Sequence, residues 1–207
     1  MKILLASNGK FLIEEGYKLL GIPKDKIRIG WVITASKGVE KLDYLERHKK
    51  AMQDEGYKFE EFDIEGKTEG EILNFFEDKN VIHIEGGNTF YLLKVIKEMG
   101  FDKTLRKLFE KGLAYVGSSA GAYIMCPTIE VSRFGRNVHR TFGLTDLTAL
   151  NYVPFSLKVH YTDDMEADVR EIMKQLKYPL RILRDGQGIF VEDNKYTFIG
   201  NGEEIKL

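Results

Sequence analysis

The segment from Ala114 to Ala122, AYVGSSAGA, joins an apolar run directly to a turn of small residues around a serine. This pattern predicts a buried strand, a sharp turn and a helix, with Ser119 held in a strained conformation at the turn. The neighbours must be small because the strand and the following helix crowd together there. Ser119 is therefore a candidate nucleophile, and the alternative is a Gly/Ser-rich turn without chemistry.

The rest of the chain alternates short apolar runs with longer segments of helical spacing. This alternation predicts a mostly parallel sheet with helices on both faces, an α/β three-layer sandwich. We expect a single domain over residues 1–207 that ends in a C-terminal hairpin turning at Asp193 and Asn194. The expected strands are 3–6, 29–34, 57–64 near a sheet edge, 81–84, 157–160 and 180–183, and the expected helices are 11–20, 44–55, 72–77, 91–99, 105–111 and 165–176.

The charge balance argues against several classes of partner. The chain has 31 Lys and Arg against 32 Asp and Glu, so we expect no binding to nucleic acid or to an anionic membrane. No window approaches the roughly 18 apolar residues of a spanning helix, and we expect a cytoplasmic protein. The single cysteine, Cys126, excludes an internal disulfide framework and a cysteine-cluster metal site. We expect no metal, no cofactor, and a monomer or homodimer.

A serine hydroxyl needs a neighbouring base, and histidine is the usual choice. His160 follows an apolar run, so it falls at the carboxyl end of a predicted strand, where catalytic groups gather in α/β sheets. It is the best of the four histidines. We expect His48 to be solvated on an exposed helix and His83 to be a core histidine with a backbone partner. His139 lies in a loose basic segment where nothing positions it.

The third member of a serine site accepts the other imidazole N–H and fixes the tautomer. Asp185 occupies the turn after the predicted strand 180–183, again at a carboxyl end, and we assign it this role. The competing carboxylates, each of which is more often ordinary loop polarity, are Glu130, Asp146, Asp163 and Asp164.

Acyl transfer also produces an oxyanion that backbone N–H groups must stabilise. The amide of Ala120 follows the nucleophile at a helix N-terminus and is the expected first donor. Gly87 can supply the second, because glycine tolerates the unusual φ that an inward-pointing N–H requires. We assign Asn88 of the same loop to substrate binding. A phosphate cradle is the rival interpretation of this loop, but neither dinucleotide nor P-loop spacing is present.

Several motifs together resemble the peptidase E family of serine peptidases, which includes alpha-aspartyl dipeptidases and is related to cyanophycinases. They are EGGNTF at 85–90, GSSAGA at 117–122, CPTI at 126–129, the VH pair at 159–160 and DG at 185–186. The resemblance implies a fold like that of class I glutamine amidotransferases, with serine in place of cysteine. It also implies hydrolysis of small peptides, with Ser119 as nucleophile, His160 as base, and Gly87 and Ala120 as oxyanion donors. The chain order Ser, His, acid argues against an esterase or lipase.

Two departures from the family pattern bear on specificity and on the acid. Members that prefer an N-terminal aspartate carry an arginine on the helix after the histidine, where this chain has Asp168, with Arg170 two residues on. Arg133 is a further candidate for binding a carboxylate. A carboxylate at 168 would repel an acidic side chain, so aspartyl specificity is in doubt. An aspartate that some members carry after the Pro-Thr-Ile stretch is replaced by about Phe134, which leaves Asp185 as the third member, one carbon shorter than the expected glutamate.

The sequence therefore predicts a serine hydrolase that cleaves amide bonds of small peptides through an acyl-enzyme. One alternative keeps the site but changes the substrate, for instance to a non-ribosomal amide or a branched amino-acid polymer. The other alternative is a binding or regulatory module that retains the fold without activity.

Overall fold

A seven-stranded sheet in the order β3-β2-β4-β5-β1-β8-β9 forms the centre of the computed structural model, which describes residues 1–134 and 140–207. The five strands from β3 to β1 are parallel, and the last two pair antiparallel. The predicted α/β class and C-terminal hairpin are confirmed, whereas His139 lies outside the described residues. The strands of this sheet are β1 (Lys2–Ala6), β2 (Arg28–Val32), β3 (Lys58–Phe62), β4 (Val81–Ile84), β5 (Ala114–Ser118), β8 (Gln187–Glu192) and β9 (Lys195–Gly200).

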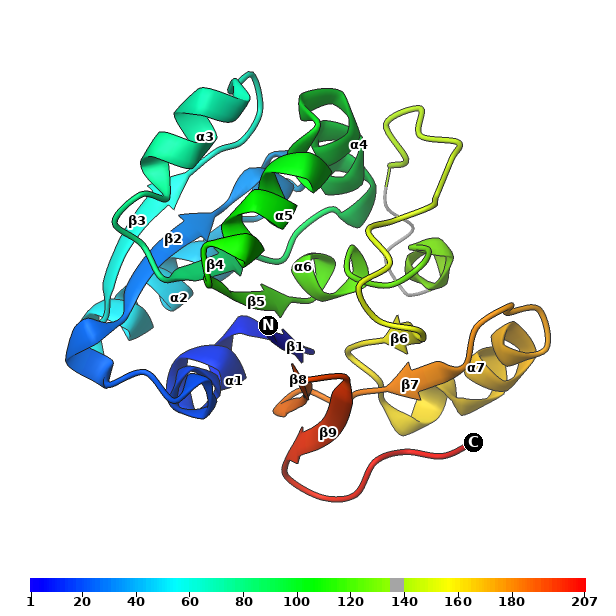
Figure 1. Cartoon of the computed structure of the whole chain (residues 1–207). Coiled ribbons are helices and arrows are strands. Elements are labelled where there is room, and N and C mark those ends of the chain that lie inside the picture. The colour runs from blue at the N-terminus through cyan, green and yellow to red at the C-terminus, as the bar shows by residue number, and fades with distance from the viewer. Residues whose placement is uncertain (135–139) are drawn as a thin grey trace.

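Helices cover both faces of the sheet, as Figure 1 shows. One apolar core lies between the sheet and α1 and α2, and a larger core lies under the helices from α3 to α6. No helix in the described ranges is long and apolar enough to cross a membrane. The helices are α1 (Gly9–Glu14), α2 (Asp43–Asp54), α3 (Glu69–Phe75), α4 (Thr89–Met99), α5 (Phe101–Glu110), α6 (Ala120–Tyr123) and α7 (Glu166–Met173).

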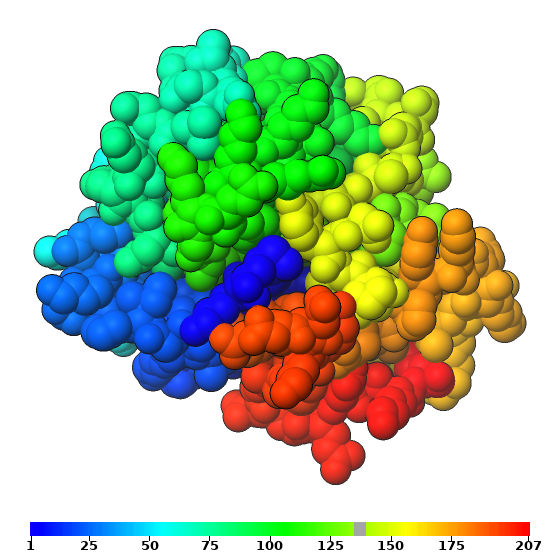
Figure 2. All heavy atoms as spheres, in the orientation of Figure 1, coloured from blue at the N-terminus to red at the C-terminus, as the bar shows by residue number. Residues whose placement is uncertain are grey.

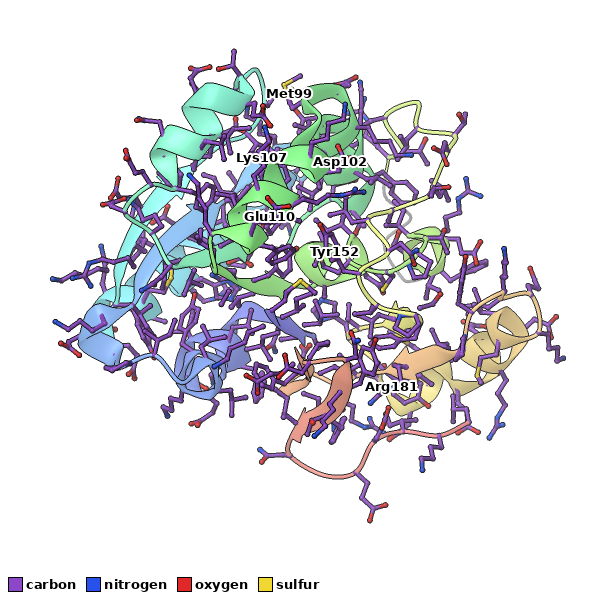
Figure 3. The ribbon with its side chains drawn as sticks, viewed as in Figure 1. Met99, Asp102, Lys107, Glu110, Tyr152 and Arg181 are labelled. Atoms are coloured by element: carbon purple, nitrogen blue, oxygen red, sulfur yellow. The ribbon has the colours of Figure 1, made fainter. Side chains whose placement is uncertain are left out.

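The amphipathic pattern of α5 shows how these helices meet the sheet. Leu105 and Leu108 are buried in the larger core, whereas Asp102, Lys107 and Glu110 stand on the outer side of the helix, as Figure 3 shows. Apolar residues spaced three or four positions apart give a helix one face to bury. This layer supports the sheet from the side opposite α1 and α2.

A small parallel sheet of two strands, β6 (Ser156–Lys158) and β7 (Leu180–Ile182), lies beside the main sheet together with α7. The sequence predicted both strands but not their separation from the main sheet. The hairpin β8–β9 packs against the N-terminal strand β1, as the orange-red spheres beside the dark blue ones show in Figure 2. Arg181 of β7, labelled in Figure 3, pairs with Glu204 near the C-terminus.

Several predicted elements, among them the strand expected over 57–64 and the helix expected over 165–176, are shorter than expected, and two others show a physical reason. The expected helix 11–20 breaks at Glu15 and continues as a 3₁₀ turn over Gly16–Leu20. A Cβ at Gly16 would lie 2.7 Å from Leu4 Cδ2, so close packing on β1 decides the residue there. The strand expected over 29–34 ends at Val32, and the hydroxyl of Thr34 bonds to Asp63 and to the Ile64 amide instead. In both places a tertiary contact overrides the local pattern.

The turn around Ser119 is crowded in the way the sequence predicts. A Cβ at Gly117 would lie 2.4 Å from the Gly121 carbonyl oxygen, and a Cβ at Gly121 would lie 2.2 Å from the carbonyl oxygen of Ile84. Both contacts are with backbone, which cannot move aside as a flexible side chain can. Glycine at 117 and 121 is therefore what lets α6 begin directly above β4 and β5.

We expect Gly121→Ala to destabilise the protein by about 1–3 kcal/mol, because the added methyl group overpacks a backbone contact. Gly70→Ala is the control, because a Cβ at this position of α3 meets open space. The control is expected to stabilise by up to about 1 kcal/mol, since alanine loses less backbone entropy than glycine on folding. Urea unfolding of the two variants measures the difference, and equal effects would contradict the packing argument.

Candidate active site

Ser119 stands where β5 ends and α6 begins, and its backbone is strained. Its φ of 47° and ψ of −104° lie outside the regions that non-glycine residues normally occupy. The Ser119 amide donates to the Ala6 carbonyl of the neighbouring strand β1 at 3.0 Å, which holds the turn in place. Strained residues of this kind cluster at functional sites, where the surrounding structure fixes them.

His160 and Asp185 come from the small sheet and meet Ser119 at the edge of the main sheet. His160 Nε2 lies 3.0 Å from Ser119 Oγ, and His160 Nδ1 lies 2.7 Å from Asp185 Oδ1. A carboxylate can only accept, so the proton of the neutral ring is on Nδ1 and Nε2 accepts from the serine hydroxyl. Among the competing carboxylates, Asp146, Asp163 and Asp164 bond to other residues, which leaves Asp185 as the partner of His160 in the described part of the chain.

Ser7, at the end of β1, joins the histidine to the acid. Its buried hydroxyl accepts from the His160 backbone N–H at 2.9 Å and donates to Asp185 Oδ1 at 2.7 Å. The bonds from His160, and to a lesser extent from Ser7, hold the pKa of Asp185 below its usual value. The sequence analysis missed Ser7, although a polar residue at the carboxyl end of a buried strand was the available signal.

The two amides assigned to the oxyanion belong to Gly87, in the loop after β4, and to Ala120, which directly follows Ser119. Gly87 has a φ of 148°, and a Cβ there would lie 2.4 Å from the Ala35 carbonyl oxygen, so only glycine fits. Among the described residues, neither the Gly87 N–H nor the Ala120 N–H donates to another group. Both are therefore available to a ligand beside Ser119.

A buried carboxylate, Glu85, lies at the base of the same loop. Its Oε1 accepts from the Gly86 N–H at 2.7 Å and from the Ser118 hydroxyl at 2.6 Å. Its Oε2 accepts from Trp31 Nε1 at 3.1 Å and from His48 Nδ1 at 3.0 Å. Burial alone would raise the pKa of Glu85, but these bonds, that from His48 foremost, lower it to about 2. The carboxylate is therefore ionised and fully engaged inside the protein.

The surroundings of two histidines differ from those expected. The prediction that His48 is solvated is wrong, because only 15% of its side chain is exposed and its ring faces Glu85. His83 is buried as predicted, but its Nδ1 lies 2.7 Å from the Tyr17 hydroxyl and the expected backbone partner is absent from the described contacts. Burial lowers the pKa of His83 to about 4, so the ring is neutral.

Comparison with known proteins identifies the family. A family model described as peptidase family S51 matches residues 3–199. The chain belongs to peptidase family S51. A peptidase of Pasteurella multocida is 29% identical over 203 residues, covering 97% of this chain and 98% of the relative. A peptidase E of a Nostoc species is 28% identical over 169 residues, covering 76% of this chain and 66% of the relative.

A solved structure extends the S51 assignment to the fold. The crystal structure of a candidate peptidase E from Listeria monocytogenes matches with a TM-score of 0.84 at 28% identity, covering 97% of this chain and 98% of that one. The predicted resemblance to the peptidase E family is confirmed, and the chain is a serine-type peptidase.

The cavity beside Ser119 in this S51 chain has a volume of about 370 Å³. It lies between the sheet edge and the helices α1 and α2. Its lining residues are Asn8, Gly9, Lys10, Tyr44, Arg47, His48, Glu85, Gly86, Gly87, Ser118, Ser119 and His160.

The residues that the sequence linked to substrate binding and specificity, Asn88, Asp168 and Arg170, do not line this cavity. Asn88 is buried, where its side chain caps α4 by accepting from the Tyr91 amide and donates to the Arg140 carbonyl. Asp168 lines a separate hollow on α7, which Arg133 also lines. Arg170 is bonded to Glu166 one turn away on α7.

The ionised state of Glu85 predicts a pH dependence of stability. Its pKa in the folded protein is below the ordinary 4.5, so its contribution is complete above about pH 4.5 and is lost as the pH falls toward 2. We expect Glu85→Gln to destabilise by about 1–3 kcal/mol at pH 7, and to lose less further stability than the wild type between pH 5 and pH 2.5. Urea unfolding across this range measures both effects.

Glu110→Gln on the exposed side of α5 is the matched control, and its stability to urea should change with pH as that of the wild type does. Parallel pH curves for the wild type and Glu85→Gln would show that another group carries the acid sensitivity.

Proposed function

We propose that this S51 peptidase hydrolyses amide bonds in small peptides through an acyl-enzyme on Ser119. The observation that supports this best is the continuous hydrogen-bonded line from Ser119 Oγ through the His160 ring to Asp185, with contacts of 3.0 and 2.7 Å. The strained turn presents the hydroxyl, the ring takes its proton, and the carboxylate stabilises the cation that forms.

The reaction in this proposal has two halves. Ser119 Oγ attacks the scissile carbonyl while His160 Nε2 takes the hydroxyl proton, and the oxyanion accepts from the Gly87 and Ala120 amides. When the C–N bond breaks, His160 gives the proton to the leaving amine. Water, activated by the same nitrogen, then attacks the ester, and the second tetrahedral intermediate collapses to release the acid and restore Ser119.

The size and charge of the cavity support a small anionic substrate. Its volume of about 370 Å³ is at the lower end of the range for small-molecule sites. Lys10 and Arg47 are its exposed cations, and Arg47 makes no hydrogen bond or ion pair with any described residue. The carboxylate of Glu85 is already occupied by four donors. We propose that Arg47 binds the free C-terminal carboxylate of a short peptide.

We propose that the residue before the scissile bond is neutral rather than acidic. Asp164, Asp168 and Glu171 all line the hollow on α7. These three carboxylates outnumber the two cations of the hollow, Arg133 and Lys158, and the ammonium group of Lys158 already donates to the Phe134 carbonyl at 2.9 Å. Carboxylates in this position would repel an acidic side chain. Neutral N-terminal residues are therefore the proposed substrates.

We also propose a cytoplasmic location. Cys126 is buried and has no disulfide partner, which supports a reducing compartment. Its burial raises the pKa of the thiol, so the residue acts as a packing element. Fractionation of cells that produce the protein tests this location, and recovery outside the cytoplasmic fraction would contradict it.

A fluorophosphonate probe tests the nucleophile. We expect labelling of the wild type and none of Ser119→Ala, because the reaction joins phosphorus to the activated serine oxygen with loss of fluoride. We expect Asp185→Asn to label about 10³-fold more slowly, because an amide that donates to Nδ1 imposes the wrong tautomer on His160. Mass spectrometry of the labelled peptide identifies the residue, and an unlabelled wild type would count against a peptidase site at Ser119.

A set of dipeptides tests the specificity. We expect turnover of substrates with a neutral N-terminal residue, slower turnover of Asp-Xaa substrates, and a KM about 10-fold lower for a free C-terminal carboxylate than for its amide. Arg47→Gln should remove the advantage of the carboxylate. Arg170→Gln is the control, because Arg170 is bonded to Glu166 and lies outside the cavity. A wild type that prefers Asp-Xaa, or an unchanged KM ratio in Arg47→Gln, would contradict this specificity.

A further inference from the structure

Three successive peptide units form the loop between β4 and α4, and each is held by a different partner. The N–H of the unit that joins Glu85 to Gly86 donates to Glu85 Oε1 at 2.7 Å and to Ser118 Oγ at 3.0 Å. The N–H of the unit that joins Gly87 to Asn88 donates to a backbone carbonyl at 2.9 Å. The middle unit, between Gly86 and Gly87, has one hydrogen bond in the described part of the chain. Its carbonyl accepts from the Tyr44 hydroxyl at 3.0 Å.

The middle unit carries the proposed oxyanion donor, and its orientation decides where that donor points. The described residues contain no cis peptide bond, so the Gly86 carbonyl and the Gly87 N–H point in opposite directions. Both flanking residues are glycine, which offers little steric resistance to rotation of the unit. A half-turn would replace a donor with a carbonyl oxygen at the place where negative charge develops.

We propose that Tyr44 is a positioning residue for the oxyanion donor, an inference that rests on the proposed function. Its hydroxyl holds the Gly86 carbonyl on the side of α2 and thereby aims the Gly87 N–H toward the substrate carbonyl at Ser119. These four residues all line the same cavity, and a Cβ at Gly86 would lie 3.2 Å from the Cβ of Ser119. Fixing a donor before the reaction is what makes an oxyanion site effective.

The hydroxyl that does this is itself well supported. Burial, and next the charge of Glu85, raise the pKa of Tyr44, so the phenol stays protonated and remains a donor. The Tyr44 ring meets the ring of His48 edge to face, with centroids 6.0 Å apart, and His48 in turn donates to Glu85. Glu85 fixes the peptide unit between Glu85 and Gly86, and its partner His48 contacts Tyr44. Tyr44 in turn fixes the next unit, between Gly86 and Gly87.

Tyr44→Phe tests the proposal, because it removes the hydroxyl and keeps the ring. The rate constant kinact and the binding constant KI of a fluorophosphonate probe are measured across pH, since the phosphoryl oxygen of the probe occupies the position of the oxyanion. We expect kinact to fall about 10- to 100-fold. Removing a whole oxyanion donor lowers the rate about 10²- to 10³-fold, and Tyr44→Phe only loosens the donor. We expect KI to stay within twofold and the pH midpoint of labelling to be unchanged.

Tyr91→Phe is the matched control, because this tyrosine on α4 is also half-buried and loses one hydroxyl bond, to Glu65 at 2.8 Å, away from Ser119. It should label like the wild type. A crystal structure of Tyr44→Phe is expected to show the middle peptide unit rotated or in two orientations.

Labelling of Tyr44→Phe within twofold of the wild type, a loss confined to KI, or an unrotated peptide unit would overturn the positioning role alone. An unlabelled wild type would instead contradict the proposed function, and with it this inference.

Discussion

The close approach of α6 to the ends of β4 and β5 is the constraint on which the site depends. Gly117 and Gly121 allow backbone to touch backbone at distances that no side chain would permit. The chain can then turn from strand to helix within a single residue, and Ser119 takes the strain of that turn. Such strain persists only where the surroundings over-determine it. Here the surroundings are the central strands of a buried parallel sheet.

The carboxyl ends of three adjacent strands, β1, β5 and β4, supply the groups that surround the hydroxyl. Ser7 follows β1, Ser119 follows β5, and Gly87 follows β4. The base comes from a separate small sheet, and the Ser7 hydroxyl joins it to the main sheet through the backbone of His160. The arrangement explains how residues 153 positions apart in the sequence are held within 3 Å of one another.

The sequence was sufficient for the parts of this architecture that leave a local pattern. Continuous apolar runs predicted the buried strands, and GSSAG predicted the turn at Ser119. Strand ends pointed to His160 and Asp185. Ser7 and Glu85 also follow strand ends, but their significance, like that of His48, lies in partners that are distant in the sequence. His48 shows the difficulty best, since its neighbours are charged and only the fold brings its ring to Glu85. The hydroxyl of Tyr44 escaped notice for the same reason.

The two histidine–carboxylate pairs of this site perform opposite electrostatic tasks. Asp185 is half-exposed, and in the proposed mechanism its charge helps the His160 ring to accept a proton. Glu85 is buried on the loop that carries the proposed oxyanion donor Gly87, and an uncompensated negative charge there would oppose the proposed reaction. Its four donors direct N–H and O–H groups, which carry partial positive charge, at both of its oxygens. The same bonds immobilise Gly86, so the carboxylate gives the loop rigidity while its partners offset the repulsion that its charge would otherwise exert on the oxyanion.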